Sequence, residues 1–148
     1  MTDIFVPFFS AFFASMGFAL LYNVRKKHLI VAPLCGAFAW MVYLVADIYT
    51  DSLVIPYFIS GISIALYSEL TATLFKAPAT VFLIPGIIPL VPGLTIYRTM
   101  EACLYGNIQA FAEGLVNTLK IGGAISLGLI LISSFFRILR TRLHLLKK

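Results

Sequence analysis

Long apolar runs alternate with short polar or basic connections along this chain. The runs cover about residues 4–22, 29–50, 53–74, 78–101 and 108–137. A helix rises about 1.5 Å per residue and the hydrocarbon core of a bilayer is about 30 Å thick, so a run of about 20 apolar residues predicts a membrane-crossing helix. The pattern therefore predicts an all-α integral membrane protein: a single transmembrane domain over residues 1–148, with five transmembrane helices.

The composition supports this interpretation and excludes a soluble domain. Of the 148 residues, 61% are hydrophobic and 11% are charged, whereas a soluble domain carries about 25% charged residues. The net charge of +5 does not indicate nucleic-acid binding, because the basic residues lie at the ends of apolar runs without an aromatic and basic surface pattern. We therefore expect the chain to lie in a lipid bilayer and to bind no nucleic acid.

Basic residues predict the direction of the chain through the membrane. Nine of them follow the first, third and fifth runs: Arg25, Lys26, Lys27, Lys76, Arg137, Arg140, Arg142, Lys147 and Lys148. Lysine and arginine are retained in the cytoplasm, so the N-terminus is expected outside and the C-terminus inside, with a basic cytoplasmic tail at 138–148. The first run lacks a basic n-region and a cleavage site, so we expect it to stay as a helix.

The fifth run is too long for a simple crossing, since about 30 residues make a helix of roughly 45 Å. Its first part is expected to tilt, protrude or lie in the interface. Polar residues recur there at helical spacing, at Gln109, Glu113, Asn117 and Lys120. This polar stripe is either a solvated surface or the lining of an outer vestibule.

Small residues in the runs predict close helix packing. Glycine lets two membrane helices approach closely, and Gly17, Gly36, Gly61 and Gly122 are the candidates. The two cysteines, Cys35 and Cys103, fall near opposite faces of the predicted domain, so they are expected to be packing residues without a disulfide.

The stretch "PGIIPLVPG", residues 85–93, lies inside the fourth run. The other four prolines fall within the first turn or two of a predicted span, where the missing N–H costs little: Pro7, Pro33, Pro56 and Pro78. In contrast, Pro85, Pro89 and Pro92 remove donors from the helix interior, so the carbonyls of Val81, Pro85 and Ile88 lose their helical partners. The midpoint of 78–101 is near Pro89, which predicts a break at mid-membrane.

Unpaired peptide groups cannot face lipid, so this backbone must face protein or a water-filled cavity. Broken helices at mid-depth form substrate and ion sites in transporters. The alternative is a proline kink that only shapes the bundle; three prolines with Gly86 and Gly93 are more than a kink needs.

Two ionisable residues near the break are candidates for function. Arg98 either pairs with Glu101 one turn further on or holds a substrate carboxylate through two parallel hydrogen bonds. Glu69, near the inner end of the third run, either reaches the interface or carries protons. Enzyme motifs are absent, including zinc-binding and nucleophile-elbow patterns. We therefore expect no enzyme activity, no cofactor and no metal site.

The segment "KAPATVFLIPGIIPLVPGLTIYRTM", with "SEL" near the end of the third run, resembles the threonine/serine exporter family, in particular its small membrane-only half. The resemblance covers nearly the whole chain. The matching positions are Glu69, Pro78, Thr80, Pro85, Gly86, Pro89, Pro92, Gly93, Tyr97 and Arg98. Some members fuse two membrane halves; others split them into two subunits, and the split type resembles bacterial exporters of succinate and related dicarboxylates.

The resemblance implies secondary export of a small carboxylate-bearing metabolite across the bacterial inner membrane. A larger membrane subunit would supply the other half, although a homo-oligomer is an alternative. In this hypothesis the break (Pro85, Gly86, Pro89, Pro92 and Gly93), Tyr97 and Arg98 bind substrate, and Glu69 couples transport to protons. The substrate, threonine/serine or a dicarboxylate, stays open. Two other functions stay open as well: a non-transporting subunit that stabilises a partner, and half of a channel.

Overall fold

The computed structural model describes residues 2–145, which fold into six α-helices without any strand. The helices are α1 (Thr2–Leu21), α2 (Val31–Tyr49), α3 (Ile55–Phe75), α4 (Thr80–Ile87), α5 (Gly93–Leu104) and α6 (Ile108–Leu145), with short 3-10 turns at η1 (Lys26–His28) and η2 (Ile88–Leu90). The predicted all-helical fold is confirmed.

Helix ends follow local chemistry. Pro56 stands in the first turn of α3, where its missing N–H breaks no helical bond. The same helix ends at Phe75, and the next residue, Lys76, adopts the left-handed conformation (φ 49°, ψ 47°) and turns the chain toward α4. In α6, residues 129–145 contain neither proline nor glycine, so nothing local ends this helix before its last described residue.

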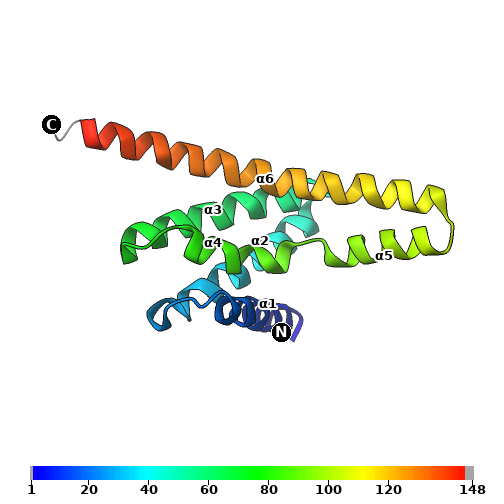
Figure 1. The fold of residues 1–148 in the computed structure, drawn as a ribbon, viewed down its shortest axis with the longest axis horizontal. Coiled ribbons are helices and arrows are strands. Elements are labelled where there is room, and N and C mark those ends of the chain that lie inside the picture. The colour runs from blue at the N-terminus through cyan, green and yellow to red at the C-terminus, as the bar shows by residue number, and fades with distance from the viewer. Residues whose placement is uncertain (1, 146–148) are drawn as a thin grey trace.

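Helix α6 is the long axis of the molecule (Figure 1). Helices α1 to α4 pack around one another on one part of it, with α3 alongside α6. Helix α5 leaves this bundle and returns as the first half of α6, so the two form an antiparallel hairpin. The core lies where α2, α3, η2 and α6 meet, and its buried residues are Cys35, Ala39, Ile64, Leu90, Ile121 and Ile125.

The number of crossings stays a prediction. Within residues 2–145, three helical segments are long and apolar enough to span a membrane: Lys26–Tyr49, Ile55–Phe75 and Ile108–Leu139. The bent pair Thr80–Leu90 with Gly93–Leu104 makes a fourth if it counts as one span. The apolar segment Phe5–Leu21 of α1 is shorter than that length. The described part of the chain thus contains three or four candidate spans, against the five predicted.

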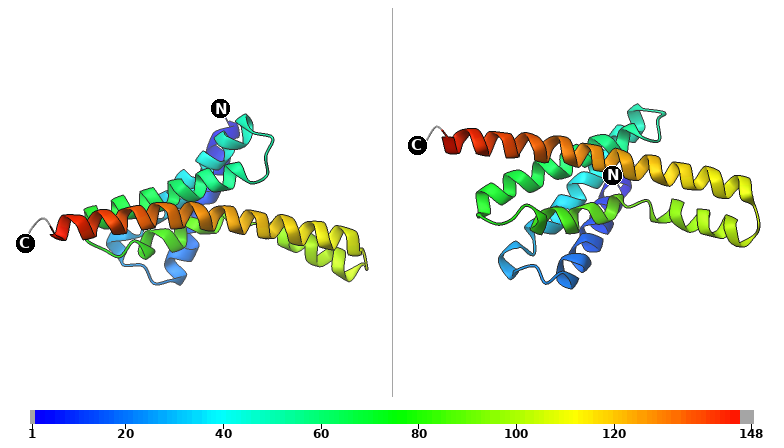
Figure 2. Two further views of the ribbon diagram at one scale, coloured as in Figure 1. Left: turned by 90° about the horizontal axis from the view of Figure 1, so that it is seen from above. Right: turned by 45° about the horizontal axis from the view of Figure 1, so that its top comes forward.

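The hairpin of α5 and α6 extends well past the connection between α2 and α3, in every view of the fold (Figures 1 and 2). Helix α6 has 38 residues, about 57 Å at 1.5 Å per residue. Of the arrangements expected for the first part of this run, the structure adopts protrusion from the bundle. Helix α6 continues through most of the predicted basic tail at 138–148, to Leu145, and residues 146–148 lie outside the described part. The cytoplasmic location of this tail stays a prediction.

Glycines set the spacing between helices at some of the predicted places. A methyl group added at Gly61 would lie 2.8 Å from the carbonyl oxygen of Ile125, so α3 and α6 touch backbone to backbone. The same contact includes Gly128, which the sequence did not single out. Gly36 also packs closely, but nothing lies within 4 Å of the corresponding position at Gly17 or Gly122. The prediction is wrong for those two, because they face away from the neighbouring helices.

Candidate functional site

The fourth predicted span is interrupted within the stretch 85–93. Helix α4 ends at Ile87, η2 follows, and α5 begins at Gly93 with its axis bent by 51° from the preceding segment. Pro85 stays inside α4, so the interruption begins later than the first proline. The depth of this break in a bilayer stays a prediction.

The break has a local cause in its prolines. Val91, which precedes Pro92, is extended (φ −60°, ψ 128°), as expected for a residue before proline. The carbonyl of Ile88 has no N–H four residues on, because Pro92 stands there, and it accepts instead from the N–H of Val91 at 3.2 Å. The N–H of Gly93 bonds to the carbonyl of Val91 at 2.7 Å. Hydrogen bonds between residues three and two positions apart therefore replace part of the lost helical pairing between residues four apart.

The first half of the break is sheltered by protein. Pro85 and Gly86 are buried, as is Leu90. A methyl group at Gly86 would lie 2.7 Å from the sulfur of Cys35 on α2. Pro89 lies close to Gly36 of α2, which also touches Ser15 of α1. Helices α1 and α2 thus cover this side of the broken segment.

Small polar groups line the protein side of the break, and the sequence reasoning missed most of them. The Cys35 sulfur lies 3.8 Å from the hydroxyl oxygen of Ser68, whose hydroxyl donates to the carbonyl of Ile64 at 2.7 Å. The hydroxyl of Ser15 is buried without a hydrogen-bond partner among the described residues. A lone serine in an apolar run was the only available signal for Ser15, and such a residue more often bonds to its own helix backbone.

Tyr97 and Arg98 lie apart from the buried part of the break. Both are exposed on α5, which packs against α6. Arg98 lines a surface hollow of about 260 Å³ between α5 and α6, together with Thr95 and Gly114. The alternative ion pair between Arg98 and Glu101 is not formed in the described part of the chain. The Arg98 side chain is therefore directed to the surface between the two helices of the hairpin.

Glu69 is half-buried on α3, the helix that also reaches Cys35 beside the break. The α3 residues in contact with Cys35 are Ile64 and Ser68. Glu69 follows Ser68 by one residue, which is about 100° around a helix of 3.6 residues per turn. The predicted site residues thus divide by burial: Pro85 and Gly86 are buried, Pro89, Pro92 and Glu69 are half-buried, and Gly93, Tyr97 and Arg98 are exposed.

The polar stripe lies on the outside of the hairpin. Asn107 caps α6, accepting from the N–H of Ala110 at 3.1 Å. Gln109 donates to Glu113 at 3.2 Å. Glu113 also lines a shallow hollow with Asn117 and Lys120. These residues form an open surface of the protruding hairpin.

The comparisons with known proteins identify the family. The model of the family described as threonine/serine exporter, ThrE, matches residues 7–135. No curated protein and no solved structure matches the chain. The match includes the interrupted segment 85–93, Glu69, Tyr97 and Arg98. With apolar helices long enough to span a membrane, this is a membrane protein of the exporter type. The chain belongs to the threonine/serine exporter family.

Proposed function

We propose that the chain is a subunit of a secondary-active exporter of small carboxylate-bearing metabolites in the bacterial inner membrane. It crosses that membrane five times, with the N-terminus outside and the C-terminus in the cytoplasm. The substrate is threonine or serine, or a succinate-type dicarboxylate. The site is the interruption at 85–93, and transport is coupled to protons.

The observation that carries this proposal is the pair of helix ends at the break. The chain leaves η2 at Leu90 and enters α5 at Gly93, so a carbonyl end and an N–H end lie close together. The N-terminus of a helix carries partial positive charge and favours anions. Broken helices in other transporters bind substrate carboxylates in this way. Residues Pro89, Pro92 and Gly93 would form this part of the site.

Arg98 and Tyr97 complete the site in this proposal. Arg98 stands five residues after Gly93, a little over one turn into α5. Its guanidinium can hold a carboxylate through two parallel hydrogen bonds, a geometry that lysine cannot reproduce. Because Arg98 and Tyr97 are exposed in the single chain, the substrate would be enclosed from the other side by a second subunit. Glu69 would carry the coupled proton.

The exposed surface of the protruding hairpin supports the proposal that the chain has a partner subunit. It exposes large apolar side chains that a single chain leaves uncovered, among them Leu94, Tyr97, Met100, Leu104 and Ile108, with Leu104 86% exposed. In a membrane protein such side chains face either lipid or a neighbouring subunit, and in this proposal a subunit covers them. The partner we propose is a larger membrane subunit of the same family, inverted relative to this chain, with a second copy of the chain as the alternative.

Counterflow in proteoliposomes tests this function. The purified chain is reconstituted with and without the larger subunit, vesicles are loaded with serine, threonine or succinate, and uptake of the labelled solute is measured. We expect counterflow of one of these solutes when both subunits are present. The absence of counterflow for all three, with both subunits correctly inserted, would contradict the proposal.

A second candidate is a non-transporting subunit that assembles or stabilises its partner, and half of a channel is a separate alternative. The exposed hairpin favours this candidate, because its apolar surface suits assembly whether or not the break binds solute. Arg98→Lys and Glu69→Gln distinguish the two. Lost transport with an intact complex supports the exporter, whereas full transport in both variants would remove the roles proposed for these residues.

A further inference from the structure

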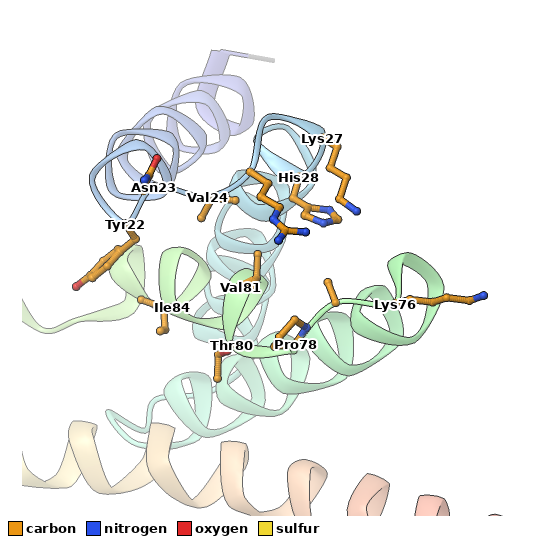
Figure 3. A pocket seen from close by; sticks show the side chains of 12 residues that line it. Tyr22, Asn23, Val24, Lys27, His28, Lys76, Pro78, Thr80, Val81 and Ile84 are labelled. Atoms are coloured by element: carbon orange, nitrogen blue, oxygen red, sulfur yellow. The ribbon is translucent and has the colours of Figure 1, made fainter.

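A basic pocket lies at the end of the bundle where two connections meet (Figure 3). It has a volume of about 470 Å³ and is formed by the connection from α1 to α2, the connection from α3 to α4, and the first turns of α4. Its polar lining includes Arg25, Lys27, His28, Lys76 and Thr80. None of these residues takes part in the break or the hairpin.

The lining carries positive charge without compensation. Arg25, Lys27 and Lys76 come from two connections that are about 50 residues apart in the sequence, and no aspartate or glutamate is among the lining residues. Like charges that converge on one pocket repel each other, and a bound anion relieves that repulsion. Lys76 stands on the other connection at the edge of the pocket, and its side chain extends away from Lys27 and His28 (Figure 3), so this long side chain would have to swing inward to meet a ligand together with them.

A buried imidazole adds an unpaired polar atom to the same wall. His28 is only 2% exposed. Its ring is held by edge-on contacts to Phe75 and Phe82, with centroids 5.4 Å and 5.2 Å away. Its Nδ1 has no hydrogen-bond partner among residues 2–145, and buried polar atoms are seldom left unpaired. The Nδ1 is itself buried, so a ligand oxygen could become its partner only if the ring turned toward the pocket.

The remaining wall is apolar, which determines the class of ligand. Tyr22, Val24, Val81 and Ile84 line it, and Tyr22 is 57% exposed. Arg25, Lys27 and Lys76 are also among the residues from which the cytoplasmic side is predicted, so the pocket is expected at headgroup depth. Basic pockets between helices on that side bind acidic headgroups.

We propose that this pocket binds the phosphate group of an acidic phospholipid, with the acyl chains along Tyr22 and Ile84. The cations from both connections hold the phosphate oxygens, and the bound headgroup links the start of α2 to the start of α4. The site is separate from the proposed carboxylate site, and its occupancy can be measured without transport.

Native mass spectrometry of the purified chain in a mild non-ionic detergent tests the proposal. The probes are phosphatidylglycerol and, as the neutral reference, phosphatidylcholine. Arg25→Gln with Lys76→Gln should weaken retention of phosphatidylglycerol about 25-fold, at about fivefold for each cation removed. The matched control is Lys26→Gln with Lys120→Gln, which removes the same charge outside the pocket and should retain the lipid.

Competition identifies the source of the phosphate. Glycerol phosphate and succinate are added at millimolar concentration to the complex with phosphatidylglycerol. Persistence of the lipid supports the phospholipid, and displacement by glycerol phosphate alone supports the same phosphate site with a soluble occupant. Three results would overturn the proposal: displacement by succinate but not by glycerol phosphate, equal loss of lipid in the two double variants, or equal retention of the two lipids by the unmodified chain. Thermal unfolding of each variant establishes that it is folded.

Discussion

Gly86→Ala tests how tightly the broken segment packs against α2. The added methyl group would lie 2.7 Å from the Cys35 sulfur and 3.1 Å from its Cβ, whereas optimal contacts between such atoms are about 3.5–4.0 Å. Both residues are buried, so one helix must shift. Overpacking of this kind costs about 1–3 kcal/mol. Alanine in place of glycine returns about 0.5–1 kcal/mol of helix propensity, so the middle of these ranges leaves a net loss of about 1 kcal/mol.

The assay is reversible unfolding in mixed micelles, with export measured in parallel. Cys35→Ala removes the sulfur, so combining it with Gly86→Ala should restore part of the loss, with a coupling energy of about 0.5–3 kcal/mol, as found for residues in contact. Gly122→Ala is the control, because nothing lies within 4 Å of its added methyl group. If Gly86→Ala is as harmless as Gly122→Ala, or if the two changes at 35 and 86 are additive, the packing described for the break is wrong.

Two further predictions concern packing and topology. Gly128→Val should destabilise the chain by about 3 kcal/mol, at the upper end for overpacking. Its Cβ would lie 2.7 Å from the carbonyl oxygen of Phe58, which belongs to the backbone and cannot move aside. Gly122→Val on the same helix should cost far less, and equal unfolding midpoints for the two variants would refute the contact. Cys103 is exposed and Cys35 is buried, so a membrane-impermeant maleimide should label only Cys103. This labelling should occur from outside intact cells. If it required permeabilised cells, the orientation would be the reverse of the one proposed.

The local features of the fold could be predicted from the sequence. Apolar runs of the right length predict helices, and prolines without an N–H identify the stretch in which the fourth run is interrupted. These signals depend only on neighbouring residues. The position of the interruption within the stretch was less accessible, because Pro85 is accommodated inside α4 and the change of direction comes at Val91 and Pro92.

Contacts between distant residues could not be predicted in the same way. A glycine in an apolar helix permits close approach, but the sequence does not say which face meets a neighbour. Gly36 and Gly61 therefore pack as expected while Gly17 does not. The separation of Arg98 from the buried part of the break depends on α5 pairing with α6; the short connection 105–107 favours that pairing, but no local signal says which face of α5 it covers.

Substrate protection of an engineered cysteine tests the central claim most directly, namely that the break faces an aqueous site that binds the transported anion. Val91 is 47% exposed in the break, and Leu127 is 58% exposed on α6 as a lipid-facing control. Each is changed to cysteine after Cys35→Ala and Cys103→Ser, in the complex with the partner. We predict that a small water-soluble thiol reagent modifies Val91→Cys but not Leu127→Cys, and that the transported solute slows this reaction. Equal inertness of both cysteines, or modification that the solute leaves unchanged, would contradict the account.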